Sequence, residues 1–170
     1  CKKLFFLFLL LTIRGVGICQ SVLKSHGGII RGSTVEKKIA LVFTGDEFGD
    51  GGAFIARALK RQHVHASFFL TGNFYRNPDF KPVITELQEN GNYLGTHSDK
   101  HPLYCDWIKR DSLLISHQQF EEDLENAYRE LKKWDIDKKK APYFLPAYEW
   151  YNDSISAWTR EAGLQLVCFT

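Results

Sequence analysis

The sequence predicts an α/β fold built on a parallel sheet, and three observations indicate it. Short apolar runs alternate with segments whose apolar residues recur at helical spacing. Glycine, proline and asparagine mark the turns between these segments. About 150 residues follow an N-terminal leader, which is the length of one domain with its own core. Strands that alternate with helices in one domain form right-handed parallel βαβ units.

Five short runs are the predicted strands. They cover residues 39–43, 64–70, 93–94, 143–145 and 164–169. The first run, Ile-Ala-Leu-Val-Phe, is apolar throughout, which is typical of a strand buried on both faces.

Four helices are predicted between these strands, at residues 53–61, 82–90, 116–131 and 152–162. The third has the clearest pattern, because Ser116 and Gln119 match a capping box that satisfies backbone N–H groups of the first turn. Its expected buried face comprises Phe120, Leu124, Ala127, Tyr128 and Leu131.

The N-terminal segment has the pattern of a secretory signal peptide. Two lysines precede a ten-residue apolar region at 4–13, and two glycines lead up to Cys19. Ten residues extend only about 15 Å as a helix, so no stable membrane span is expected. The predicted organisation is a signal peptide at 1–19, a lead-in at 20–36 and a domain at 37–170. The protein is expected to be exported to the periplasm, the cell envelope or the medium.

Composition narrows the class of protein further. The formal charge of +2 is spread over mixed signs without a basic stripe, so no nucleic-acid partner is expected. Outside the leader, Cys105 and Cys168 could form one disulfide or remain free thiols. The chain has no methionine and stops at a predicted strand, so we interpret it as incomplete at both ends.

Metal-binding and polar side chains follow three of the predicted strands, where chemistry gathers in parallel α/β folds. They are Asp46, Glu47 and Asp50 after the first strand, His97 and His101 after the third, and Tyr148, Glu149 and Trp150 after the fourth.

The two histidines are four residues apart. On one helical turn such imidazoles face the same way, so they could hold one divalent ion with a carboxylate as third ligand and one position open for water. Two unrelated surface or hydrogen-bonding histidines are the alternative. Asp99, between them, is expected to be a solvent-facing loop acid.

Four segments resemble motifs of the polysaccharide deacetylase family, also called carbohydrate esterase family 4. The most specific match lies at residues 91–102, where G-N-Y-L-G-T-H-S-D-K-H-P is similar to G-x-x-x-G-x-H-[ST]-x-x-H-P. Residues 66–72, A-S-F-F-L-T-G, are similar to A-T-F-F-x-x-G. The first strand stands where the family has an A-L-T-F run, and residues 144–148, F-L-P-A-Y, resemble the start of F-R-P-P-Y-G.

The resemblance implies a distorted (β/α) barrel, of which the C-terminal part would be missing here. It also implies metal-dependent removal of N- or O-acetyl groups from a polysaccharide. His97 and His101 would bind the metal, for which Zn²⁺ suits the ligands best and cobalt, nickel and manganese are alternatives. A histidine beyond residue 170 would protonate the leaving group. Independently of the resemblance, we expect Tyr148, Glu149 and Trp150 to line a sugar-binding wall. Glu149 could instead replace a polar group that the family has and this loop lacks, and Trp150 could be only a packed lid.

The sequence departs from the family pattern after the first strand. The Asp-Asp pair of the family falls on Thr44 and Gly45, neither of which can act as a base. The carboxylates stand two positions later, so we expect a local bulge that brings Asp46 to the metal and Glu47 to the attacking water as its base. The two roles could be exchanged, Asp50 is the reserve, and polar loop residues without a role are the alternative.

The family arginine that orients the catalytic acid falls on Leu145. Two further functions therefore stand beside the deacetylase: a catalytically impaired relative that binds glycans or metal, and a hydrolase of glycosidic bonds on the same scaffold.

Overall fold

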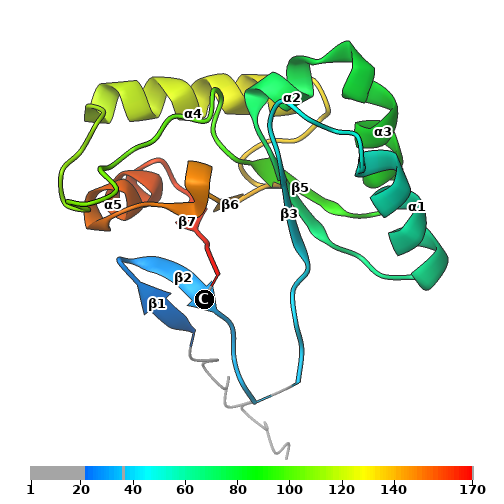
Figure 1. Cartoon of the computed structure of the whole chain (residues 1–170), viewed down its shortest axis with the longest axis horizontal. Helices are drawn as coiled ribbons and strands as arrows, with labels where there is room; N and C mark the ends of the chain where they lie inside the picture. The colour runs from blue at the N-terminus through cyan, green and yellow to red at the C-terminus, as the bar shows by residue number, and fades with distance from the viewer. Residues whose placement is uncertain (1–21, 36, 170) are drawn as a thin grey trace, which may run out of the picture.

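The computed structural model describes residues 22–35 and 37–169. Its main sheet has five parallel strands that lie side by side in chain order (Figure 1). They are β3 (Val42–Gly45), β4 (Ser67–Leu70), β5 (Tyr93–Thr96), β6 (Tyr143–Phe144) and β7 (Gln165–Leu166). Consecutive parallel strands joined by helices are the arrangement of a (β/α) barrel, and the predicted α/β fold is confirmed.

Helices connect each strand to the next. They are α1 (Gly52–Gln62), α2 (Gly72–Arg76), α3 (Lys81–Glu89), α4 (His117–Lys132) and α5 (Asp153–Glu161), with short 3₁₀ turns η1 (Pro78–Phe80) and η2 (Ala147–Glu149). Helix α1 packs beside α3, whereas α4 packs beside α2 and α5 (Figure 1). The four predicted helices are confirmed within two residues of their expected ends.

Helix α4 illustrates how the sequence determines this packing. Ser116 accepts the Gln119 N–H at 3.2 Å, and the Gln119 side chain accepts the Ser116 N–H at 2.8 Å, so the predicted capping box is confirmed. All five residues of the expected apolar face are buried against the sheet. Burial of each large apolar side chain contributes about 1.5–3 kcal/mol.

The first strand differs from the prediction. Ile39 is 88% exposed and Val42 is 40% exposed, so the expectation of a strand buried on both faces is wrong. Strand β3 begins only at Val42 and pairs with β4 alone, which makes it an edge of the sheet. Apolar composition cannot distinguish an edge strand from a central one.

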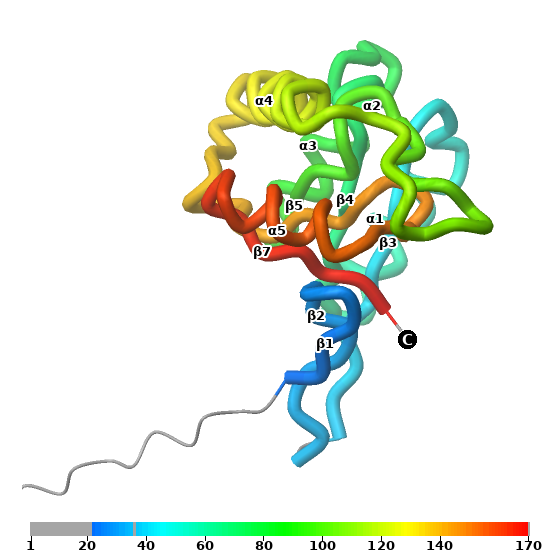
Figure 2. The backbone as a smooth tube through the Cα atoms, turned by 90° about the vertical axis from the view of Figure 1, so that its left-hand side faces the viewer, coloured from blue at the N-terminus to red at the C-terminus, as the bar shows by residue number. Residues whose placement is uncertain are grey.

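The expected lead-in contains a hairpin of β1 (Leu23–Ser25) and β2 (Gly28–Arg31). Gly27 has φ +78° in the turn, a conformation that glycine adopts without strain. Ile29 forms an isolated parallel bridge with Val167, just after β7, so the hairpin is a separate small sheet that lies beside β7 (Figure 2).

Other expectations concern the termini and the cysteines. The predicted signal peptide at 1–19 lies outside the described residues. Within residues 22–35 and 37–169, no helix is both long enough and apolar enough to cross a bilayer. Cys105 and Cys168 are free thiols, so the disulfide alternative is wrong for this structure.

Candidate functional site

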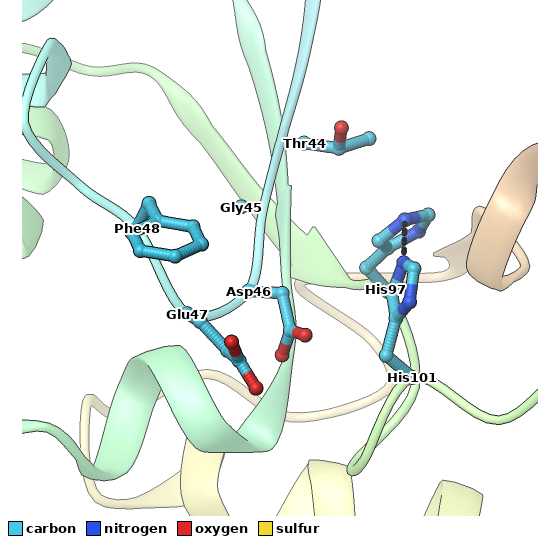
Figure 3. Close-up of a pocket in the computed structure, with 7 residues that line it drawn as sticks. All are labelled: Thr44, Gly45, Asp46, Glu47, Phe48, His97 and His101. Atoms are coloured by element: carbon cyan, nitrogen blue, oxygen red, sulfur yellow. Dashed lines mark hydrogen bonds between the residues drawn. The ribbon is translucent and has the colours of Figure 1, made fainter.

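The two histidines of the predicted site converge at the carboxyl end of β5. His97 follows the strand directly and is 2% exposed. Its Nδ1 lies 2.8 Å from the backbone oxygen of Leu145, so Nδ1–H donates to that carbonyl and Nε2 keeps its lone pair. The Nε2 atoms of His97 and His101 are 3.2 Å apart (Figure 3). The two Nε2 atoms therefore face each other at the carboxyl end of the parallel strands.

The loop that carries them is not the helical turn expected from their spacing. Ser98 has φ +80° and His101 has φ +56°, both outside the helical region. The His101 N–H donates to the Ser98 hydroxyl at 2.9 Å, which turns the chain back toward His97. The imidazoles thus face each other through a tight loop, and the helical-turn interpretation is wrong.

This geometry suits a shared divalent ion. Zinc binds histidine nitrogen at about 2.0–2.1 Å, so two such ligands on a tetrahedral ion are about 3.3 Å apart. The observed Nε2–Nε2 distance of 3.2 Å is close to that value. Burial, with a smaller contribution from the nearby His101, lowers the pKa of His97 to about 4, so its imidazole is neutral and able to ligate at neutral pH.

Asp99 lies inside the protein, and the prediction of a solvent-facing acid is wrong. It is 2% exposed, and its Oδ1 lies 2.5 Å from Nη1 of Arg76 on α2. Gly72 permits this approach, because a Cβ there would lie 1.9 Å from the same carboxylate oxygen. The Asp99 carboxylate is therefore part of the scaffold that holds the histidine loop against α2.

Helix α4 fixes the same loop from the other side. The Asp123 carboxylate accepts the N–H of Asp99 at 3.0 Å and the N–H of Lys100 at 3.2 Å. It also accepts the Tyr104 hydroxyl at 3.2 Å. Neither Asp123 nor Arg76 was predicted from the sequence, because neither belongs to a spaced pattern around the histidines.

Two predicted carboxylates, Asp46 and Glu47, line one pocket together with the two histidines. The pocket has a volume of about 240 Å³ and is lined by Thr44, Gly45, Asp46, Glu47, Phe48, His97 and His101 (Figure 3). Strand β3 keeps an unbroken register with β4 up to Gly45, so the expected bulge is absent between these two strands. Asp50 does not line this pocket; it lines an adjacent, more apolar pocket with Val83 and Leu87, which shares Thr44, Gly45 and Phe48 with the first.

Asp46 is oriented by residues of the β4–α2 turn. Its Oδ1 accepts the Thr71 hydroxyl at 2.8 Å and the Asn73 amide at 3.3 Å, which leaves Oδ2 available. Within the described ranges, however, no three His, Cys, Asp or Glu side chains are grouped closely enough to form a complete ligand set. The donor chemistry fits a divalent ion through the histidine pair, and a carboxylate must move to complete the site.

The β6–α5 loop forms the wall above the histidines. The Tyr148 ring lies 4.3 Å from the His101 ring, centroid to centroid. Glu149 Oε1 lies 3.7 Å from Nε2 of His97, and burial raises the pKa of the Glu149 carboxyl. The Trp150 ring lies tilted against Trp107, with ring centroids 5.4 Å apart, and the Arg110 guanidinium lies 3.5 Å over the Trp150 ring.

Comparison with known proteins identifies the family of this chain. A sequence model of the family described as polysaccharide deacetylase matches residues 31–167. This chain belongs to the polysaccharide deacetylase family. The peptidoglycan-N-acetylmuramic acid deacetylase PdaA of Bacillus subtilis is 24% identical over 148 residues, which make up 87% of this chain and 52% of PdaA.

Solved structures of family members share the fold. A family 4 carbohydrate esterase from Bacillus anthracis superposes with a TM-score of 0.70 at 26% identity, over 84% of this chain and 63% of that protein. A family 4 pseudoenzyme from the same species superposes with a TM-score of 0.67 at 18% identity, over 85% of this chain and 47% of that protein. This chain spans about half the length of PdaA and of the pseudoenzyme.

Proposed function

We propose that this protein is a metal-dependent hydrolase that removes N- or O-acetyl groups from a polysaccharide outside the cytoplasm. The observation that carries the proposal is the pair of Nε2 atoms of His97 and His101, 3.2 Å apart beside a pocket with two carboxylates. Membership of the family and the similarity to PdaA support the reaction class. The predicted signal peptide supports the location.

His97, His101 and Asp46 would hold the ion, most readily Zn²⁺. When bound, the ion would make the attacking water more acidic and polarise the acetyl carbonyl. Glu47 would take the proton of that water on its carboxylate. The exposed Tyr148 ring, with Trp150 behind Trp107, would offer flat apolar surface to a sugar.

Replacing Glu47 with glutamine is expected to slow acetate release from an acetylated polysaccharide by about 10²–10⁴-fold, because general-base catalysis contributes that much. The ion content of the whole protein should stay unchanged. Asp46→Asn should lower both ion content and acetate release, and Glu125→Gln, an exposed position on α4, should change neither. Acetate release at the wild-type rate from Glu47→Gln would remove Glu47 from the mechanism. If Glu47→Gln lost the ion while Asp46→Asn kept the ion and lost acetate release, the roles of Glu47 and Asp46 would be exchanged.

A catalytically impaired, glycan-binding relative is the second candidate. Leu145 is 1% exposed where the family pattern has an arginine, so no cation from this position reaches the carboxylates. A family 4 pseudoenzyme is known among the similar structures. Ion binding together with saturable glycan binding, but without acetate release, would favour this candidate over the enzyme.

A further inference from the structure

The Glu149 carboxylate, expected to line the substrate, lies beside the ion-facing nitrogen of His97. Its Oε1 is 3.7 Å from Nε2, the same atom that lies 3.2 Å from His101. The Leu145 carbonyl binds the other ring nitrogen at 2.8 Å. One loop after β6 therefore contacts both nitrogens of the His97 imidazole.

The backbone of this loop is held in a costly conformation. Tyr148 has φ +59° and Glu149 has φ +51°, in the left-handed region that favours glycine. The Glu149 N–H donates to the Pro146 carbonyl at 2.9 Å, and the Cys168 thiol lies 3.5 Å from the Glu149 carbonyl. Strain that the surroundings maintain in this way is a feature of functional sites.

We propose that Glu149 is a ligand of the divalent ion that His97 and His101 hold, in addition to Asp46, in a five-coordinate site whose fifth position is left for the attacking water. The inference rests on the proposed function, since it requires the ion. A nitrogen and an oxygen bound to one zinc ion at an angle of about 110° are about 3.4 Å apart. The observed 3.7 Å exceeds that by a few tenths of an ångström, which a small side-chain rotation removes.

The surroundings of the two carboxylates support this assignment. Asp46 already accepts two hydrogen bonds, from Thr71 and Asn73. The Glu149 side chain is 27% exposed, and in the described part of the chain no hydrogen-bond donor faces its carboxylate. A half-buried carboxylate without hydrogen-bond donors is costly unless a cation lies beside it, and an ion between the histidines would be that cation. The ion would then be held by residues that follow β3, β5 and β6.

The test is calorimetric titration of the metal-free whole protein with Zn²⁺. Glu149→Gln keeps the size of the side chain and removes its charge, and we expect Zn²⁺ to bind at least about tenfold more weakly. Glu149→Gly should weaken binding equally while its unfolding midpoint in denaturant stays the same or rises, because glycine tolerates the positive φ. A merely structural Glu149 would lose stability and affinity together. Glu125→Gln on α4 is the matched control and should bind as the wild type does.

Each outcome decides the inference. Wild-type affinity in Glu149→Gln, with binding abolished in His97→Ala, would overturn the role of Glu149 and leave the proposed function standing. Absence of Zn²⁺ binding by the wild type would overturn both.

Discussion

Replacing Arg76 with alanine is expected to lower the free energy of unfolding by about 2–4 kcal/mol. Arg76 is the cation that lies 2.5 Å from the Asp99 carboxylate, which is 2% exposed. Its removal leaves a buried charge unpaired. The expected loss lies below the largest values for buried pairs, because the Arg76 side chain is itself 35% exposed and water can enter the space it leaves.

Denaturant unfolding of the whole protein without added metal measures this loss. Arg57→Ala, at an exposed position of α1, is the matched control and should change stability by less than about 0.5 kcal/mol. The free energy of unfolding of Arg76→Lys should lie between those of Arg76→Ala and Arg57→Ala. Lysine keeps the charge but loses the second donor, which reaches the Asn73 side chain at 2.8 Å. Equal stability of Arg76→Ala and Arg57→Ala would show that the pair does not hold the histidine loop.

Replacing His97 with alanine is expected to weaken Zn²⁺ binding by more than about a hundredfold. Loss of an outer partner of a metal ligand alone costs about 10–100-fold in affinity, and His97 would be a ligand itself. Its nitrogen is already set for this role, because the bond from Nδ1 to the Leu145 carbonyl leaves Nε2 unprotonated. Equilibrium dialysis followed by elemental analysis would measure the remaining ion.

His65→Ala is the control for this change. His65 is exposed and precedes β4, at the amino end of the strands, whereas the pocket lies at their carboxyl ends. Its loss should leave one bound ion per chain. Equal retention of the ion by His97→Ala and His65→Ala would mean that any bound zinc sits elsewhere in the molecule.

Local sequence patterns predicted the helices and most of the strands because their signals are contained in short segments. The capping box at Ser116 and the apolar spacing of α4 are settled by neighbours within one or two turns. The histidine pair was also predictable, since both residues follow one strand. The barrel was predicted from the family resemblance, because no local sequence pattern indicates it.

The missed features depend on contacts between distant segments. Asp99 looks like a loop acid in sequence, and only the fold brings Arg76 to it from α2. Ile39 looks buried, and only the strand order shows that β3 is an edge. Glu149 reaches His97 because its backbone adopts a positive φ that no rule predicts for glutamate.

The position of the ion can be measured directly from crystals of the zinc-loaded whole protein, with diffraction data collected on both sides of the zinc absorption edge. We expect an anomalous peak about 2.0–2.2 Å from Nε2 of both His97 and His101. A map in which these two nitrogens remain in direct contact, with zinc bound elsewhere or absent at saturating concentration, would contradict the metal site.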